Sequence, residues 1–119
     1  MAYGSYNSIK YSSTDQVYFD RLFLLNKSIL KPIGCNVNHL RIHLGIGIRK
    51  IVEDLMARSF KTSYVTIRGL ERGMVNNVSV TYLSALADYF DLTIYDLIIS
   101  DYSILENVPK RVRLKFGKL

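Results

Sequence analysis

Apolar residues recur at intervals of three and four along most of this chain, and that spacing predicts α-helices. A first helix is expected to open at Ser13 and to stop near Pro32 and Gly34, because both residue types end helices. Further helices are expected over residues 36–44, 48–60, 63–72, 79–90 and 93–98. The sequence therefore predicts an all-α fold, preceded by residues 1–12 as a loop or a weak strand.

Polar residues at fixed offsets mark several of the expected helix ends. Thr93 followed by Asp96 has the spacing of a capping box, in which two side chains bond free backbone N–H groups of the first turn. Ser79 can cap the helix that follows it, and Gly73 can adopt the positive φ that stops a helix.

The positions expected to face inward in the helices from Ile48 and from Ser79 are Ile51, Val52, Leu55, Met56, Val80, Leu83, Leu86, Ala87 and Phe90.

The segment from Ile48 to Gly73 has the pattern of two helices folded across a short turn. A polar break at Lys61 and Thr62 separates them, which is typical of a helix-turn-helix whose second helix enters the major groove of DNA. Its hydroxyl, methyl and cationic groups are candidates for contacts to phosphates and base edges. These candidate DNA-binding residues are Arg49, Lys50, Lys61, Thr62, Ser63, Tyr64, Val65, Thr66, Arg68 and Arg72.

Charge is distributed unevenly along the chain, whose net charge is +6. Residues 36–75 hold seven Lys or Arg against three Asp or Glu, and residues 76–106 hold five acidic residues and no Lys or Arg. A folded chain with this order should carry a basic face around the helix-turn-helix, as expected for nucleic-acid contact. The alternative is an ordinary basic protein with solvated lysines.

The last residues of the chain are basic and alternate with apolar ones. Val112, Leu114 and Phe116 alternate with three basic residues, which predicts a short half-exposed strand. A basic arm reaching along DNA is the less favoured alternative. We thus expect an N-terminal extension with one amphipathic helix (1–35), a DNA-binding domain (36–100) and a basic C-terminal tail (101–119).

Candidate catalytic and metal-binding chemistry is sparse. Cys35, His39 and His43 follow one another at intervals of four, yet the sequence has no other His or Cys to complete a metal site. No paired-carboxylate, Cys–His or Gly-rich phosphate pattern can be assembled, so neither an enzyme nor a cofactor is expected. The single cysteine fits a reducing cytosol, and no secretory signal or membrane span is found, so we expect a cytoplasmic protein without a membrane partner.

The residues from Asn36 to Ile99 resemble the phage repressor/Cro-type (XRE) helix-turn-helix family. The similarity is most specific over Ile67–Gly73, which looks like that family's "Ile-x-x-Leu-Glu-x-Gly" third helix, and over Leu83–Leu97, which looks like its fourth helix and fifth-helix cap. The resemblance implies a five-helix, lambda-repressor-like domain, here with an added N-terminal helix. It also implies an ion pair between Arg41 and Glu71 that holds the fold together.

The same resemblance implies roles for the residues at the start of the third helix, when they are matched to the family by position. Ser63, Tyr64, Val65 and Arg68 would face the major groove and Thr66 would contact phosphate, whereas Gly69 would leave one reading position silent. Packing of the Tyr64 ring against the preceding helix is the alternative for that residue.

The chain departs from the family pattern between the first and third helices, because Gly45–Lys61 is longer than usual. Either the second helix or the turn before the third helix is therefore extended. With the alignment anchored on the third helix, Glu53 takes the position of the family's usual Gln and would repel phosphate. If the extension instead moves the amino end of the second helix to Gly47, Arg49 and Lys50 become the natural phosphate contacts. The sequence leaves both arrangements open.

Together these features favour a sequence-specific DNA-binding transcriptional regulator, as a repressor, that binds double-stranded DNA as a homodimer. The alternative is a protein–protein interaction module or an antitoxin-like partner-binding protein with little or no DNA binding. In that case the wide apolar sector of the first helix, or the C-terminal tail, would be the surface that binds a protein partner.

Overall fold

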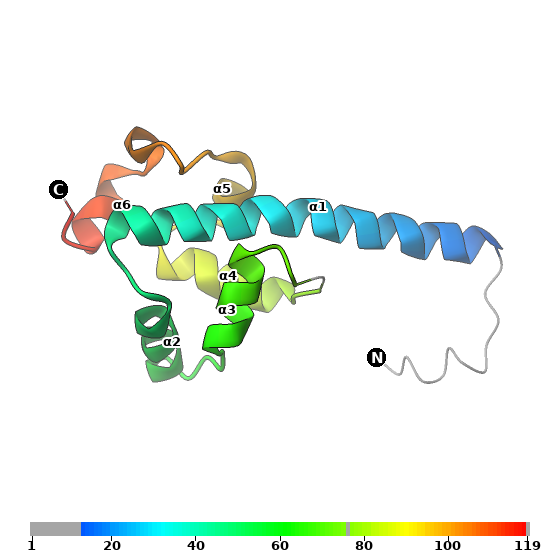
Figure 1. The fold of residues 1–119 in the computed structure, drawn as a ribbon, viewed down its shortest axis with the longest axis horizontal. Helices are drawn as coiled ribbons and strands as arrows, with labels where there is room; N and C mark the ends of the chain where they lie inside the picture. The colour runs from blue at the N-terminus through cyan, green and yellow to red at the C-terminus, as the bar shows by residue number, and fades with distance from the viewer. Residues whose placement is uncertain (1–12, 76, 119) are drawn as a thin grey trace.

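Every regular secondary-structure element in the described part of the chain is a helix. A computed structural model describes residues 13–75 and 77–118, with side chains from residue 28 onward, so the expectation for residues 1–12 lies outside the described residues. The all-α prediction is confirmed (Figure 1). The elements are α1 (Ser13–Leu44), α2 (Ile48–Ala57), α3 (Tyr64–Glu71), α4 (Val80–Tyr89), α5 (Ile94–Ile99), a 3₁₀ turn (Leu105–Asn107) and α6 (Lys110–Lys115).

One continuous helix, α1, replaces the two helices predicted for this part of the chain. Pro32 lies inside it, so the predicted break at Pro32 and Gly34 was wrong. A proline lacks an N–H group and its ring crowds the carbonyl four residues earlier, which usually ends a helix. Here Ile33 and Val37 are fully buried, and this packing offsets the missing hydrogen bond because tertiary contacts supply most helix stability in proteins.

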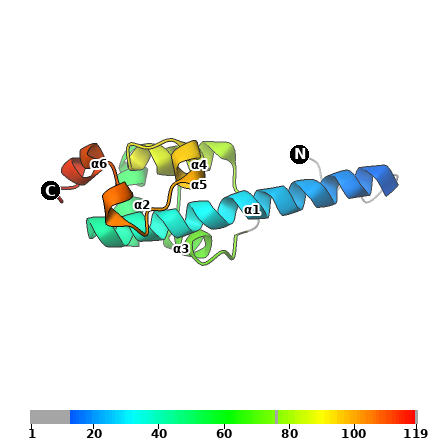
Figure 2. The ribbon, with the colours of Figure 1, turned by 90° about the horizontal axis from the view of Figure 1, so that it is seen from above.

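The helices pack around one apolar core. Helix α1 packs against α3 and α5, α2 packs against α3 and α4, and α4 packs against α5. Both ribbon views show the N-terminal part of α1 extending past the other described helices (Figures 1 and 2). The fully buried apolar side chains include Ile33, Val37, Leu40, Ile51, Leu55, Ile67, Leu70, Leu86, Phe90, Leu97 and Val112.

Asn36 ties α1 to the end of α5 from a buried position. Its Nδ2 donates to the carbonyl oxygens of Leu97 (2.7 Å) and Ser100 (2.8 Å), and its Oδ1 accepts from the N–H of Tyr102 (3.0 Å). Backbone groups that α5 leaves unbonded at its end are therefore satisfied by a side chain of α1.

The caps predicted at Ser79 and Thr93 are confirmed, but two predicted inward positions are wrong. Thr93 and Asp96 form the capping box, and Ser79 Oγ accepts from the N–H of Tyr82 at 3.1 Å. Met56 and Val80 are instead 54% and 71% exposed. Met56 lies one position past the buried stripe Ile48, Ile51 and Leu55, and Val80 lies in the first turn of α4, ahead of its buried stripe.

Several helices end with a residue at positive φ. The residue is Gly45 after α1, Ser59 after α2, Gly73 after α3, Asp91 after α4 and Gly117 after α6. After α2, the N–H of Ser59 bonds Met56 O and the N–H of Phe60 bonds Leu55 O, both at 2.9 Å. This is a Schellman motif. A glycine adopts the positive φ that this motif requires without steric cost, whereas Ser59, at φ 62°, carries such a cost.

The C-terminal residues form a helix, α6, so the predicted strand was wrong. Val112 is fully buried and Phe116 packs against the core, and their spacing of four places them on one side of a helix. Leu114, which belongs to the same alternating pattern, is 54% exposed. The Phe116 ring lies 5.6 Å from the Tyr89 ring, which packs α6 against the end of α4.

Candidate nucleic-acid interface

Helix α3 has one side in the core and one side exposed. Ile67 and Leu70 are buried, whereas Val65 is 77% exposed and Tyr64 is 46% exposed. Arg68 is partly exposed. The side chains predicted to face a DNA groove at the start of α3 are therefore accessible, and Tyr64 is not packed into the interior.

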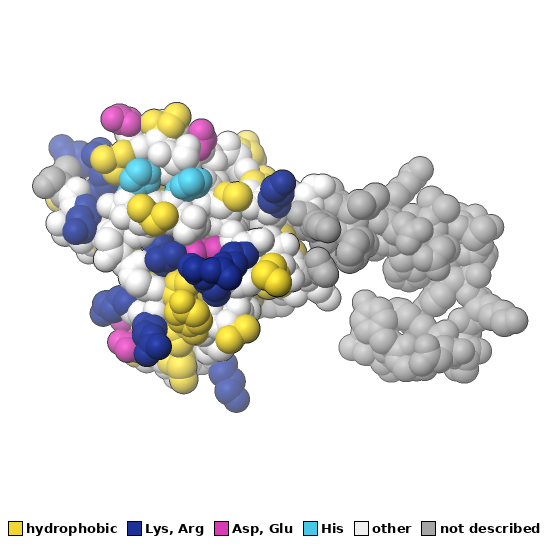
Figure 3. Space-filling model, in the orientation of Figure 1, with side chains coloured by type: hydrophobic (Ala, Val, Ile, Leu, Met, Phe, Trp, Pro, Cys, Tyr) yellow, Lys and Arg dark blue, Asp and Glu magenta, His cyan; other side chains and the backbone are white. Residues whose placement is uncertain are grey.

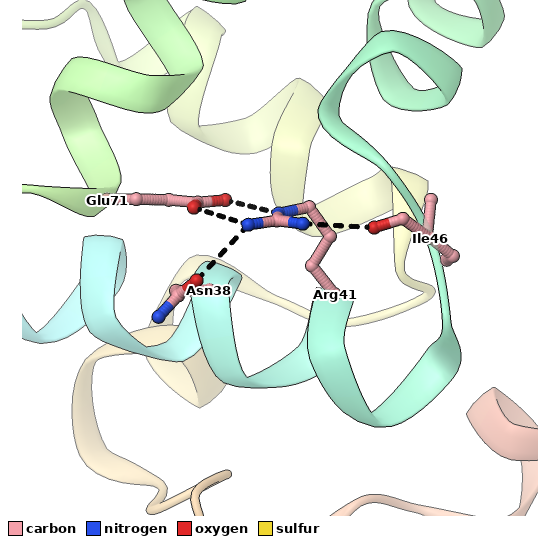
Figure 4. Close-up of polar contacts among 4 residues, drawn as sticks. All are labelled: Asn38, Arg41, Ile46 and Glu71. Atoms are coloured by element: carbon pink, nitrogen blue, oxygen red, sulfur yellow. Dashed lines mark hydrogen bonds and ion pairs between the residues drawn. The ribbon is translucent and has the colours of Figure 1, made fainter.

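An ion pair fixes α3 to α1, as predicted (Figure 4). Arg41 Nε donates to Glu71 Oε2 at 2.7 Å and Arg41 Nη2 donates to Glu71 Oε1 at 2.9 Å, a two-bonded contact with a fixed geometry. The guanidinium also donates to Ile46 O and Asn38 Oδ1. The hydrogen bond to Glu71 raises the pKa of Arg41, which favours the charged guanidinium.

Close backbone contact also sets the position of α3. A Cβ atom on Gly34 would lie 2.0 Å from the carbonyl oxygen of Leu70. Only glycine lets α1 approach the end of α3 this closely, which explains a glycine inside α1 where the sequence predicted a helix end. The two contacts together orient the exposed side of α3.

Side chains at the start of α3 have local partners. Ser63 is its N-cap, and Ser63 Oγ accepts from the N–H of Thr66 at 3.2 Å. The hydroxyls of Ser63 and Thr66 also bond to each other at 2.9 Å. Both predicted contact residues thus help to form the helix terminus.

The connection between α2 and α3, residues 58–63, is anchored on α4. The ring of Phe60 lies 5.6 Å from that of Tyr82, and Thr62 Oγ1 lies 2.6 Å from Tyr82 Oη. The Thr62 hydroxyl, a predicted DNA contact, is therefore engaged within the protein. Residues 58–63 thus follow a defined path, although they exceed the usual turn of three or four residues.

The amino end of α2 lies at Gly47, one of the two arrangements that the sequence left open. Arg49 and Lys50 therefore occupy the first turn of α2, and both are exposed. Arg49 has no charged partner among the described residues, whereas Lys50 Nζ lies 2.9 Å from Asp54 Oδ1. The hydrogen bond from Tyr89, helped by Lys50, holds the pKa of Asp54 below its ordinary value.

A shallow hollow of about 510 Å³ lies along the exposed side of α3. Val65, Gly69, Met74 and Val75 line it together with Arg68 and Arg72. In the space-filling view, Lys and Arg side chains lie next to hydrophobic ones over α2 and α3 (Figure 3). Met74 and Val75 were not among the predicted contact residues, because their only signal in the sequence is that two apolar residues directly follow Gly73.

Lys61 and Arg72, the remaining predicted contacts, are both exposed. The described residues contain no group of three metal-binding side chains. His43 Nε2 lies 3.0 Å from Ser103 O, and Cys35 is an exposed free thiol. The His43 ring is thus in contact with the backbone of its own chain.

Comparison of the chain with protein-family models, with curated proteins and with solved structures finds no match. Within the described residues, no helix combines the length and the apolar content that crossing a bilayer requires.

Proposed function

We propose that this chain is a sequence-specific DNA-binding transcriptional regulator, a repressor, whose helix α3 enters the major groove of double-stranded DNA. The observation that supports this most directly is the two-sidedness of α3. Its inner side is fixed by Ile67, Leu70 and the ion pair of Glu71, and its outer side leaves Val65 and Arg68 accessible. A rigid helix with a free outer side is what base reading requires.

The accessible groups on and near α3 suit the two kinds of DNA contact. Arg68 can donate two bonds to a guanine edge, and the Val65 methyls can touch a thymine methyl. Arg49, Lys61 and Arg72 are exposed cations that can neutralise phosphates. Lys50 forms an ion pair with Asp54, so we expect it to contribute less to phosphate binding.

We further propose that the protein acts in the cytoplasm as a homodimer on two half-sites about one helical turn apart. The N-terminal part of α1 extends beyond the other described helices, and its sequence is rich in apolar residues. A helix that extends past its own fold with such a sequence suits pairing with a second copy.

Selection of bound sequences from a random DNA pool tests this proposal. The expected result is an enriched palindromic site whose binding weakens steeply as salt rises. Recovery of no enriched sequence, together with early elution from a heparin column, would contradict it.

A second candidate function is a protein-interaction module or antitoxin on the same fold. The exposed apolar side chains Met56, Val65 and Met74, at 54%, 77% and 73%, favour it. Binding to a protein partner that is independent of salt, without enrichment of any DNA sequence, would support this alternative.

A further inference from the structure

The centre of the exposed side of α3 is apolar and recessed. Val65, Gly69 and Arg72 follow one another at intervals of four and three, so they share one side of the helix. This side is opposite the buried Ile67 and Leu70. The position at the middle of the outer side therefore carries no side chain.

The segment after α3 completes a recess at this position. The N–H of Met74 bonds Gly69 O at 2.8 Å, which turns the chain back along the helix. A Cβ atom on Gly69 would lie 3.0 Å from Val75 Cγ2. Met74 is 73% exposed beside it. Because Gly69 has no side chain, Val75 packs directly against the helix there, and the recess lies between Val65, Met74 and Val75.

Charge and polarity at the recess indicate what it would bind. Arg68 and Arg72 line the same hollow, so the surface is apolar within a cationic frame. Duplex DNA supplies the matching partner, because its phosphates are anionic and the thymine 5-methyl is the apolar group that base edges present in the major groove. A protein partner would have to bury the two guanidiniums as well.

We propose that the recess at Gly69 is a thymine-specific subsite, in which Val65 and Met74 contact the 5-methyl group of a thymine in each half-site. The inference rests on the proposed DNA-binding function. It assigns a reading role to the position that the family resemblance left silent, and it adds Met74 to the residues that determine specificity.

Replacing thymine by uracil in the selected duplex tests the subsite, because that change removes only the methyl group. One thymine per half-site should be sensitive, with binding about fourfold weaker per half-site. That factor corresponds to about 0.8 kcal/mol, the value of burying one such group. The other thymines should tolerate the change.

Variants of exposed residues test whether the recess is the cause of this sensitivity to the thymine methyl group. Val65→Ala and Met74→Ala should each bind the thymine and uracil duplexes within about twofold of one another. Val80→Ala removes an equally exposed apolar side chain from α4 and should keep the full discrimination.

Two failures can be told apart. If the wild-type protein binds its selected site but treats every uracil duplex like the thymine duplex, the subsite is wrong and DNA binding stands. If no site is enriched, the proposed function itself is wrong.

Discussion

Arg41 joins α1 to α3 through a carboxylate that is almost buried, so its loss should destabilise the fold. Arg41→Ala leaves Glu71, whose side chain is only 3% exposed, without its charge partner. Breaking such a pair typically costs about 3–5 kcal/mol. Chemical unfolding measures the change. The control Lys50→Ala breaks an exposed pair with Asp54 and should cost less than about 1 kcal/mol. Equal losses in the two variants would contradict the structural role of Arg41.

Arg68 should determine sequence preference and not stability. It is partly exposed on α3 and has no ion-pair partner among the described residues. Arg68→Ala should weaken binding to the selected site by about 1–3 kcal/mol at an unchanged melting temperature. Arg72→Ala is the matched control, since a phosphate contact weakens binding to all sequences alike. An equal loss on specific and random DNA for Arg68→Ala would show that it only touches phosphate.

Single residues could be predicted where their partner is close in sequence or belongs to a strong motif. Thr93 and Asp96 are three residues apart, and the pairing of Arg41 with Glu71 followed from the family resemblance. The engagement of Thr62 with Tyr82 could not be predicted, because the two lie 20 residues apart and meet only when residues 58–63 fold onto α4.

At the scale of elements, a substitution at the end of α2 should stabilise the fold. Ser59 adopts φ 62° at a position where glycine has no steric cost, and its side chain is exposed. Ser59→Gly should therefore raise the free energy of unfolding by about 0.5–1 kcal/mol. Gly73→Ala, which makes the opposite change after α3, should lower it by a similar amount. Thermal denaturation of both variants checks the prediction, and a lower stability for Ser59→Gly would contradict it.

The contact between α1 and α3 should not tolerate a larger residue. Gly34→Ala would bring a methyl group within 2.0 Å of Leu70 O, so the two helices must separate. Overpacking of this kind costs about 1–3 kcal/mol. Because α3 also shifts, DNA affinity should fall in protein that is still folded, which binding assays well below the melting temperature would detect. Unchanged stability and binding would show that the contact is adaptable.

Helices were predicted well wherever their apolar spacing was long and regular. The predicted break in α1 and the predicted C-terminal strand were wrong for one shared reason. Pro32, Gly34 and the alternating tail are local signals, whereas burial of Ile33, Val37 and Val112 against other helices decides the outcome. Local propensity is a weak guide when tertiary packing opposes it.

At the scale of the whole molecule, one long helix connects the proposed DNA-reading surface to a distant end. Helix α1 holds α3 through Gly34 and Arg41, and its N-terminal part extends past the body (Figure 2). If two copies pair along that part, the same helix fixes the distance between their α3 helices. The spacing of the two half-sites would then depend on residues that touch no DNA.

This arrangement predicts that a charge in the N-terminal part of α1 separates the two copies. Leu22→Glu should convert a dimer into a monomer in sedimentation experiments, since burying an unpaired carboxylate between apolar helices is costly. Binding to a palindromic site should weaken strongly, while binding to a single half-site should change little. Arg21→Glu, a charge change at an already polar position, is the control. A wild-type protein that sediments as a monomer, or a Leu22→Glu protein that remains a dimer, would rule out this part of α1 as the dimer interface.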